Sequence, residues 1–127
     1  MQTPTRPSEA AIDAFLARGG DMLATTDAAG HITWCNAAFQ TRTGCAGDAA
    51  GVELAALAHP ETDPAALDAL RHGFDSGAGV SGIEIALAGR DAHARDEVLW
   101  CLVKTMPVDA AVRSSGFACV LHDRRAL

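Results

Sequence analysis

The stretch TTDAAGHITWCNAAFQTRTG, residues 25–44, decides the fold that this sequence predicts. Asp27–Gly30 is a turn signal, because Asp is favoured at the first position of a type I turn and Gly at the fourth. The alternating run His31–Cys35 then predicts the second strand of a β-hairpin. Asn36 is a favoured helix N-cap, and the residues after it predict a short helix with Phe39 on its inner side. The stretch therefore predicts a hairpin followed at once by a short helix.

Length and composition indicate one globular domain. The chain has 127 residues, of which 49% are hydrophobic and 20% are charged. This balance is typical of a folded domain rather than of a disordered chain. No apolar stretch approaches the roughly 20 residues that a membrane-spanning helix needs, and the N-terminus, MQTPTRPSEA, lacks the apolar region of a signal peptide. We therefore expect a cytoplasmic domain without membrane insertion.

The charge balance is acidic. Lys and Arg number 10 against 16 Asp and Glu, which gives a net charge of −6. Nucleic acids and anionic membranes attract basic surfaces, and the only adjacent basic pair is Arg124-Arg125. The sequence therefore predicts no nucleic-acid partner.

The four cysteines form no metal-binding or disulfide pattern. They are Cys35, Cys45, Cys101 and Cys119, with no C-x-x-C pair and no histidine at ligand spacing beside them. A free cysteine inside an apolar strand usually behaves as a small buried hydrophobic residue. We therefore expect no metal site, and the cysteine usage fits a reducing compartment.

The N-terminal part predicts a lead-in and one amphipathic helix. Residues 1–7 carry two prolines and are expected to be disordered, whereas residues 8–19 have helical spacing and end in glycine. Ile12, Phe15 and Leu16 form an apolar stripe that is too narrow for the helix to be stable alone in water. The stripe is expected to contact either its own domain or a second copy of the chain.

Residues 20–125 predict helices between two groups of strands. Asp63 is a favoured N-cap, and Leu67, Leu70 and Phe74 share one face of the helix that follows it. A short helix is predicted over residues 52–58, and the remaining strands over residues 21–26, 80–87, 97–108 and 116–122. This order is typical of an α+β domain built on an antiparallel sheet.

With its elements in this order, the chain resembles the PAS sensor domain family. The resemblance rests on TTDAAGHITWCNAAFQTRTG, AHPETD, EVLWCLVKTMPV and GFACVLHDRRAL, which lie in this order within residues 20–125. The family pattern falls on Asp27, Gly30, Ile32, Trp34, Asn36, Phe39, Thr43, Gly44, His59, Pro60, Glu61, Trp100, Pro107 and Asp123. The chain departs from it after Asp123, where the family often has an apolar residue and Thr and this sequence has Arg124-Arg125.

The resemblance implies a five-stranded antiparallel sheet with short helices on one face and the amphipathic helix at the N-terminus. It implies a sensory or regulatory module of a larger signal-transduction protein, such as a histidine kinase, a cyclic-dinucleotide enzyme, a chemoreceptor or a transcription regulator. Such a module binds a small ligand or cofactor, dimerises, or does both, and passes its signal to a covalently linked output domain. A homodimer contact is expected at Ile12, Phe15 and Leu16.

A ligand pocket is expected between the helices and the sheet. We expect it to be lined by Trp34, Asn36, Phe39, Leu67, Leu70, Ile85, Trp100 and Leu102. Helix capping is the first interpretation of Asn36, and core packing is the first interpretation of the two tryptophans. Asp123, at the end of the last predicted strand, is the candidate for signal exit.

The sequence does not identify a cofactor, and an empty pocket is among the expectations. Flavin, as FAD, is the first alternative, because tryptophans can line a site for a planar ligand. Haem is disfavoured because His72 lies off the apolar face of its predicted helix. The reactive-cysteine motif of the family's flavin photoreceptors has no match in this chain.

A second function class stays open at this point, a small α+β enzyme of the isomerase or thioesterase type with a cone-shaped pocket. Such an enzyme needs a positioned base, and the carboxylates in or beside predicted strands are Asp21, Asp27, Glu84 and Glu97. The order of residues suggests no Ser-His or Cys-His arrangement. We therefore expect no catalytic residue and a domain that is not itself an enzyme.

Overall fold

The structure is a computed structural model, and it describes residues 21–43, 51–90, 96–109, 111–112 and 115–123. The predicted lead-in, the predicted N-terminal helix and the dimer contact expected at Ile12, Phe15 and Leu16 lie outside the described residues. In the described part of the chain, no helix is long and apolar enough to cross a membrane.

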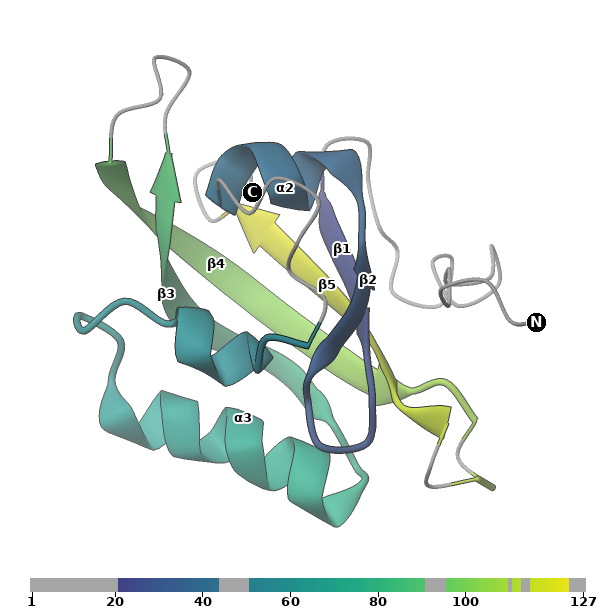
Figure 1. Ribbon diagram of the computed structural model, residues 1–127. Coiled ribbons are helices and arrows are strands. Elements are labelled where there is room, and N and C mark those ends of the chain that lie inside the picture. The colour runs from purple at the N-terminus through teal and green to yellow at the C-terminus, as the bar shows by residue number, and fades with distance from the viewer. Residues whose placement is uncertain (1–20, 44–50, 91–95, 110, 113–114, 124–127) are drawn as a thin grey trace.

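The described residues form five strands, two α-helices and one short 3-10 helix. The elements are β1 (Met22–Thr26), β2 (Ile32–Cys35), α2 (Ala37–Thr43), η1 (Leu54–Leu57), α3 (Pro64–Ser76), β3 (Val80–Arg90), β4 (Asp96–Pro107) and β5 (Phe117–Asp123). The strands form one antiparallel sheet in the order β2-β1-β5-β4-β3. Figure 1 shows the helices on one face of this sheet, so the expected five-stranded α+β architecture is confirmed.

The hairpin at the start of the fold follows the turn chemistry of its sequence. The backbone N–H of Gly30 donates to the carbonyl of Asp27 at 3.1 Å, and Asp27 Oδ1 accepts from the N–H groups of Ala29 and His31 at 2.9 Å each. Burial alone would raise the pKa of Asp27, but these hydrogen bonds and the nearby His31 side chain outweigh it and hold that pKa below its ordinary value. The turn therefore fixes the register between β1 and β2.

The helix α3 begins and ends where its sequence predicts. Asp63 Oδ1 accepts from the N–H of Ala65 at 3.0 Å, and Pro64 occupies the first turn, where its missing N–H is not needed. Gly77 closes the helix with a φ of 79°. The apolar face of α3 is thereby held against β3.

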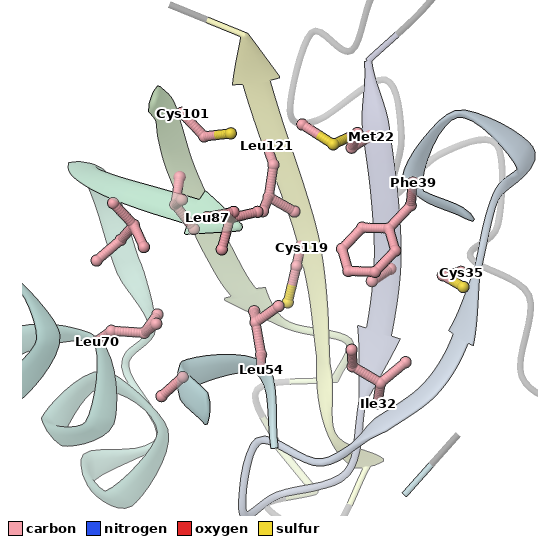
Figure 2. Packing of buried hydrophobic residues seen from close by; sticks show 14 of the residues in the cluster. Met22, Ile32, Cys35, Phe39, Leu54, Leu70, Leu87, Cys101, Cys119 and Leu121 are labelled. Carbon is pink, nitrogen blue, oxygen red and sulfur yellow. The ribbon is translucent and has the colours of Figure 1, made fainter. Parts of the chain in front are cut away.

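The core lies between the helices and the sheet. Figure 2 shows Phe39 pointing from α2 into the same cluster as Met22, Ile32 and Cys119. Leu70 reaches this cluster from α3 and Leu54 from η1. The sheet and three short helical elements thus enclose one continuous apolar interior.

Strand β3 is longer than expected, and β4 begins one residue earlier than expected. The polar stretch AGRDAHARD was predicted as a turn region, yet pairing continues through Gly89 with Glu97 and Arg90 with Asp96. A strand needs only backbone pairing at an exposed end, so polar side chains do not stop it. The polar pattern therefore placed the end of β3 three residues too early.

Candidate functional site

Four of the expected pocket residues lie together on the helix side of the sheet. Phe39, Leu70 and Ile85 are 0–1% exposed. Leu67 is partly buried and packs against the same cluster. These four residues come from α2, α3 and β3, so the structure does bring together the side chains that were predicted from three separate segments.

Three others lie on the opposite face, which we call the outward face. In the strand register Trp34 is opposite Thr25, and Trp100 and Leu102 alternate with the buried Leu99 and Cys101. They therefore do not line an interior pocket, contrary to expectation. Strand β4 is apolar on both faces, so its alternation does not reveal which face turns inward.

Asn36 joins the first helix to the first strand. Its Oδ1 accepts from the backbone N–H of Phe39 at 2.9 Å and from that of Leu23 at 3.0 Å. Its Nδ2 donates to the backbone carbonyl of Asp21 at 2.9 Å. The interpretation as a helix cap is confirmed, and the side chain also fixes the start of β1, with its Oδ1 accepting two hydrogen bonds and its Nδ2 donating one.

Replacing Asn36 with alanine is expected to lower the free energy of unfolding by about 2–3 kcal/mol, because a cap and two further hydrogen bonds are lost. Urea unfolding followed by circular dichroism measures the loss. Asn36→Asp retains the oxygen that accepts from both N–H groups, so its free energy of unfolding should fall less than that of Asn36→Ala. Equal losses for the two variants would contradict the capping role.

Asp123 is held by a cation from the first helix. Arg42 Nη2 lies 2.7 Å from Asp123 Oδ2 and 3.7 Å from Glu97 Oε1, and all three side chains are less than a third exposed. The sequence pattern predicts a role for Asp123 but not for Arg42, whose signal is its place in the last turn of α2. The contact ties the end of β5 to the helix that carries Phe39.

A double-mutant cycle with Arg42→Gln and Asp123→Asn is expected to give a coupling energy of about 1–2 kcal/mol, because the pair is close and partly buried. The unfolding free energies of the four proteins measure it. Arg71 and Glu53 form a matched, more exposed pair at 3.4 Å, for which we expect at most about 0.5 kcal/mol. Equal coupling in the two pairs would refute the special strength of the Arg42 contact.

The buried polar side chains on the helix side and at the sheet edge are threonines, and each is hydrogen-bonded. Thr62 Oγ1 accepts from the N–H of Ala86 and donates to its carbonyl, at 3.0 Å each. Thr105 Oγ1 accepts from the N–H of Val80 at 2.9 Å. Thr26 Oγ1 donates to the backbone carbonyl of Asp27. Each of these threonine hydroxyls therefore has a partner within the protein. A buried flavin ring needs partners for its carbonyl and N–H edge, and these threonine hydroxyls already have partners within the protein.

The buried cysteines offer no reactive thiol. Cys35, Cys101 and Cys119 are buried thiols, and their burial was expected. Burial raises the pKa of the Cys119 thiol far above its ordinary value, although a hydrogen bond with Thr26 acts in the opposite direction. These sulfur atoms therefore act as packing groups of the core.

Metal and haem ligands find no support in the geometry. Among the residues that the structure describes, no three His, Cys, Asp or Glu side chains are grouped to hold a metal ion. His72 lies on the exposed side of α3, away from the cluster that contains Leu70 and Phe74. It is therefore not placed to bind an iron within the interior.

The carboxylates that an enzyme would need are spread over the molecule. Asp27 belongs to the hairpin turn, and Glu84 is exposed on β3. Glu97 lies beside Arg42, and Asp21 lies beside His122 at the start of β1. The four carboxylates thus lie at four separate places, and the histidine beside Asp21 belongs to the end of β5.

Comparisons with known proteins match the structure but not the sequence. No family model and no curated protein matches this sequence. A solved structure described as an RNA-binding light-oxygen-voltage receptor aligns with a TM-score of 0.61 and 18% identity. The fold is PAS-like. The alignment covers 96% of this chain but only 36% of the receptor's chain, so the PAS-like domain corresponds to about a third of that protein.

One expectation is overturned by this neighbour. The acidic charge balance predicts no nucleic-acid partner, yet a solved protein that contains this fold is described as RNA-binding. The net charge of one domain does not decide the partners of a protein, because a local surface can differ from the average. The exclusion of nucleic acid is therefore withdrawn.

Proposed function

We propose that this PAS-like domain is the sensory module of a larger signal-transduction protein, and that it responds to a small apolar molecule. Histidine kinases, cyclic-dinucleotide enzymes, chemoreceptors and transcription regulators are the kinds of protein that it would control. The observation that carries the proposal is the double role of α2. This helix contributes Phe39 to the interior and Arg42 to the end of β5.

The chemistry of the interior supports an apolar ligand. The cluster consists of aliphatic, aromatic and sulfur-containing side chains, and the threonines beside it are already hydrogen-bonded. A ligand that enters must displace part of this packing, and Phe39 is the largest fully buried side chain among the residues that the structure describes. Movement of Phe39 moves α2, and Arg42 then pulls on Asp123 or releases it.

The proposal is tested with benzene and indole as probes of the interior. Each is titrated into the purified chain, and thermal unfolding and hydrogen exchange in β5 are followed. We expect the probe to raise the unfolding temperature, because a ligand that binds only the folded state stabilises it, and to change exchange near Asp123. In Arg42→Gln, the probe should still stabilise the protein while the change near Asp123 is lost.

Two results would overturn this function. One is a flavin or haem absorption band in the purified protein, because either group contradicts an apolar ligand. The other is the absence of both stabilisation and altered exchange with every probe, as measured against the same concentrations of glycerol. Turnover of a substrate by the isolated domain would favour the enzyme class instead.

A further inference from the structure

Residues 51–62 form a segment that we call the strap, which crosses the helix side of the sheet from one edge to the other. The strap leaves the edge strand β2, passes through η1 and reaches the opposite edge strand β3 just before α3 begins (Figure 1). Isolated β-bridges mark both crossing points. His31, next to β2, is opposite Glu53, and Ala58 is opposite Leu87 of β3. One short segment therefore contacts both edges of the sheet.

The end of the strap at β2 is attached by backbone bonds and by buried side chains. The N–H of Ile32 donates to the carbonyl of Val52 at 2.8 Å. The N–H of Leu54 donates to the carbonyl of Gly30 at 2.9 Å. Leu54 and Ala55 are each 2% exposed and belong to the core cluster. This end therefore cannot leave the sheet without unpacking the core.

The end of the strap at β3 is attached to Ala86. The carbonyl of Ala86 accepts from the N–H of His59 at 2.7 Å and from the hydroxyl of Thr62 at 3.0 Å. The same hydroxyl accepts from the N–H of Ala86 at 3.0 Å. The apolar side chains here, Leu57 and Ala58, are partly buried. The Thr62 hydroxyl thus ties this end to both polar groups of one backbone residue.

The two ends of the strap differ in how easily they can open. A segment that buries few apolar side chains opens locally at a lower free energy than the core does. Residues 57–62 bury less apolar surface than Leu54 and Ala55. The chain on either side of them is held in the core, by Leu54 of η1 and by Leu70 and Phe74 of α3. Residues 57–62 can therefore move away from β3 between two fixed points.

The part of β3 under this end leads to the apolar interior. Leu87, whose backbone is opposite Ala58, turns its side chain into the core cluster (Figure 2). Ile85, on the other side of Ala86, belongs to the same cluster, and both side chains are 1% exposed. An opening between Ala58 and Leu87 would therefore give a small molecule direct access to the core.

We propose that residues 57–62 are a gate to the interior and that the Thr62 hydroxyl is its latch. The gate opens away from Ala86 while residues 51–55 stay attached at β2, and a small apolar molecule enters beside Leu87. The entry route rests on the proposed function. The latch does not, because the gate opens without a ligand.

Amide hydrogen exchange in the unmodified chain is the first test. His59 and Leu54 each donate a backbone hydrogen bond from the strap, at 2.7 Å and 2.9 Å, one at each end. We expect the His59 amide to be at least about tenfold less protected than the Leu54 amide, because opening at β3 exposes only the former. Equal protection of the two amides would overturn the gate, because the strap would then open only together with the core.

Thr62→Val is the second test, because it removes the hydroxyl and keeps the branched shape of the side chain. The closed gate then leaves the buried N–H of Ala86 without its acceptor, so we expect the His59 amide to exchange roughly tenfold faster. The Leu54 amide should change less than about twofold, because the end at β2 stays attached. An unchanged His59 amide, or an equal change at both amides, would overturn the latch.

Thr105→Val is the matched control. Thr105 is 3% exposed, and its hydroxyl accepts from the N–H of Val80 at 2.9 Å, at the other end of β3. This variant should leave the exchange of the His59 amide unchanged, and an effect as large as that of Thr62→Val would overturn the latch. Thr62→Ser keeps the hydroxyl and should retain the original rate. Circular dichroism establishes that each variant is folded, and the comparison within the unmodified chain needs no variant.

Benzene tests the entry route. Its proton line shapes in nuclear magnetic resonance give the rate at which it leaves the folded protein. In Thr62→Val we expect this rate to rise by the same factor as the exchange of the His59 amide, because each molecule passes through the open gate. In Thr105→Val it should stay unchanged. Equal rates in all proteins would overturn the route. If benzene does not bind, the proposed function and the route fail together, whereas the His59 amide still decides the latch.

Discussion

Replacing Phe39 with alanine is expected to lower the free energy of unfolding by about 3–5 kcal/mol, as large-to-small changes of buried aromatic residues do. The side chain is 0% exposed and comes from α2, a helix of only 7 residues. Such a short helix has little stability of its own. The loss should therefore include the docking of α2 as well as the removed apolar contacts.

Urea unfolding and amide hydrogen exchange measure the two parts of this effect. Exchange in α2 should rise more than exchange in α3, because α3 keeps Leu70 and Phe74 in the core. Phe39→Leu, which retains most of the apolar contact, serves as the control, and we expect it to lose less than about 1.5 kcal/mol. An alanine variant that loses under about 1 kcal/mol would contradict a central role of Phe39 in the core.

Replacing Gly116 with alanine is expected to lower the free energy of unfolding by more than about 3 kcal/mol, from an unfavourable backbone conformation and a steric clash together. Gly116 has a φ of +83°, and an added Cβ would lie 1.9 Å from the backbone oxygen of Thr26. The clash is with the backbone of the neighbouring strand, so no side-chain rotation relieves it.

Gly51→Ala is the matched control for this prediction. Gly51 has a φ of +87°, nearly that of Gly116, but nothing lies within 4 Å of the added Cβ. Gly51→Ala should therefore lower the free energy of unfolding only by the cost of the unfavourable backbone conformation, about 1–2 kcal/mol. Denaturant unfolding of both variants separates strain from clash, and a loss at Gly51 as large as that at Gly116 would refute the close approach to β1.

The order of the elements could be predicted because each carries a local signal. The Asp27 turn, the Asn36 cap and the Asp63 cap are all read from short spacings and are all present in the structure. Pairing at the polar ends of β3 and β4 could not be predicted in this way. It depends on the backbone of the partner strand rather than on the side chains.

The faces of the sheet were harder to predict than its strands. In β4, both sets of alternate residues are apolar, and the larger Trp100 drew the interior assignment that belongs to Leu99 and Cys101. The Arg42–Asp123 contact joins residues 81 positions apart. No single-sequence pattern marks such a pair, because it arises only when α2 lies over the ends of the strands.

The position of β5 has a consequence for synthesis of the protein. Among the described strands β5 comes last along the chain, yet it lies at the centre of the sheet between β1 and β4. Until it leaves the ribosome, the two hairpins have open edges that can pair with other nascent chains. The sheet is completed only when β5 pairs with both neighbours, and chains truncated before Phe117 would expose the unpaired edges of β1 and β4 and be prone to aggregation.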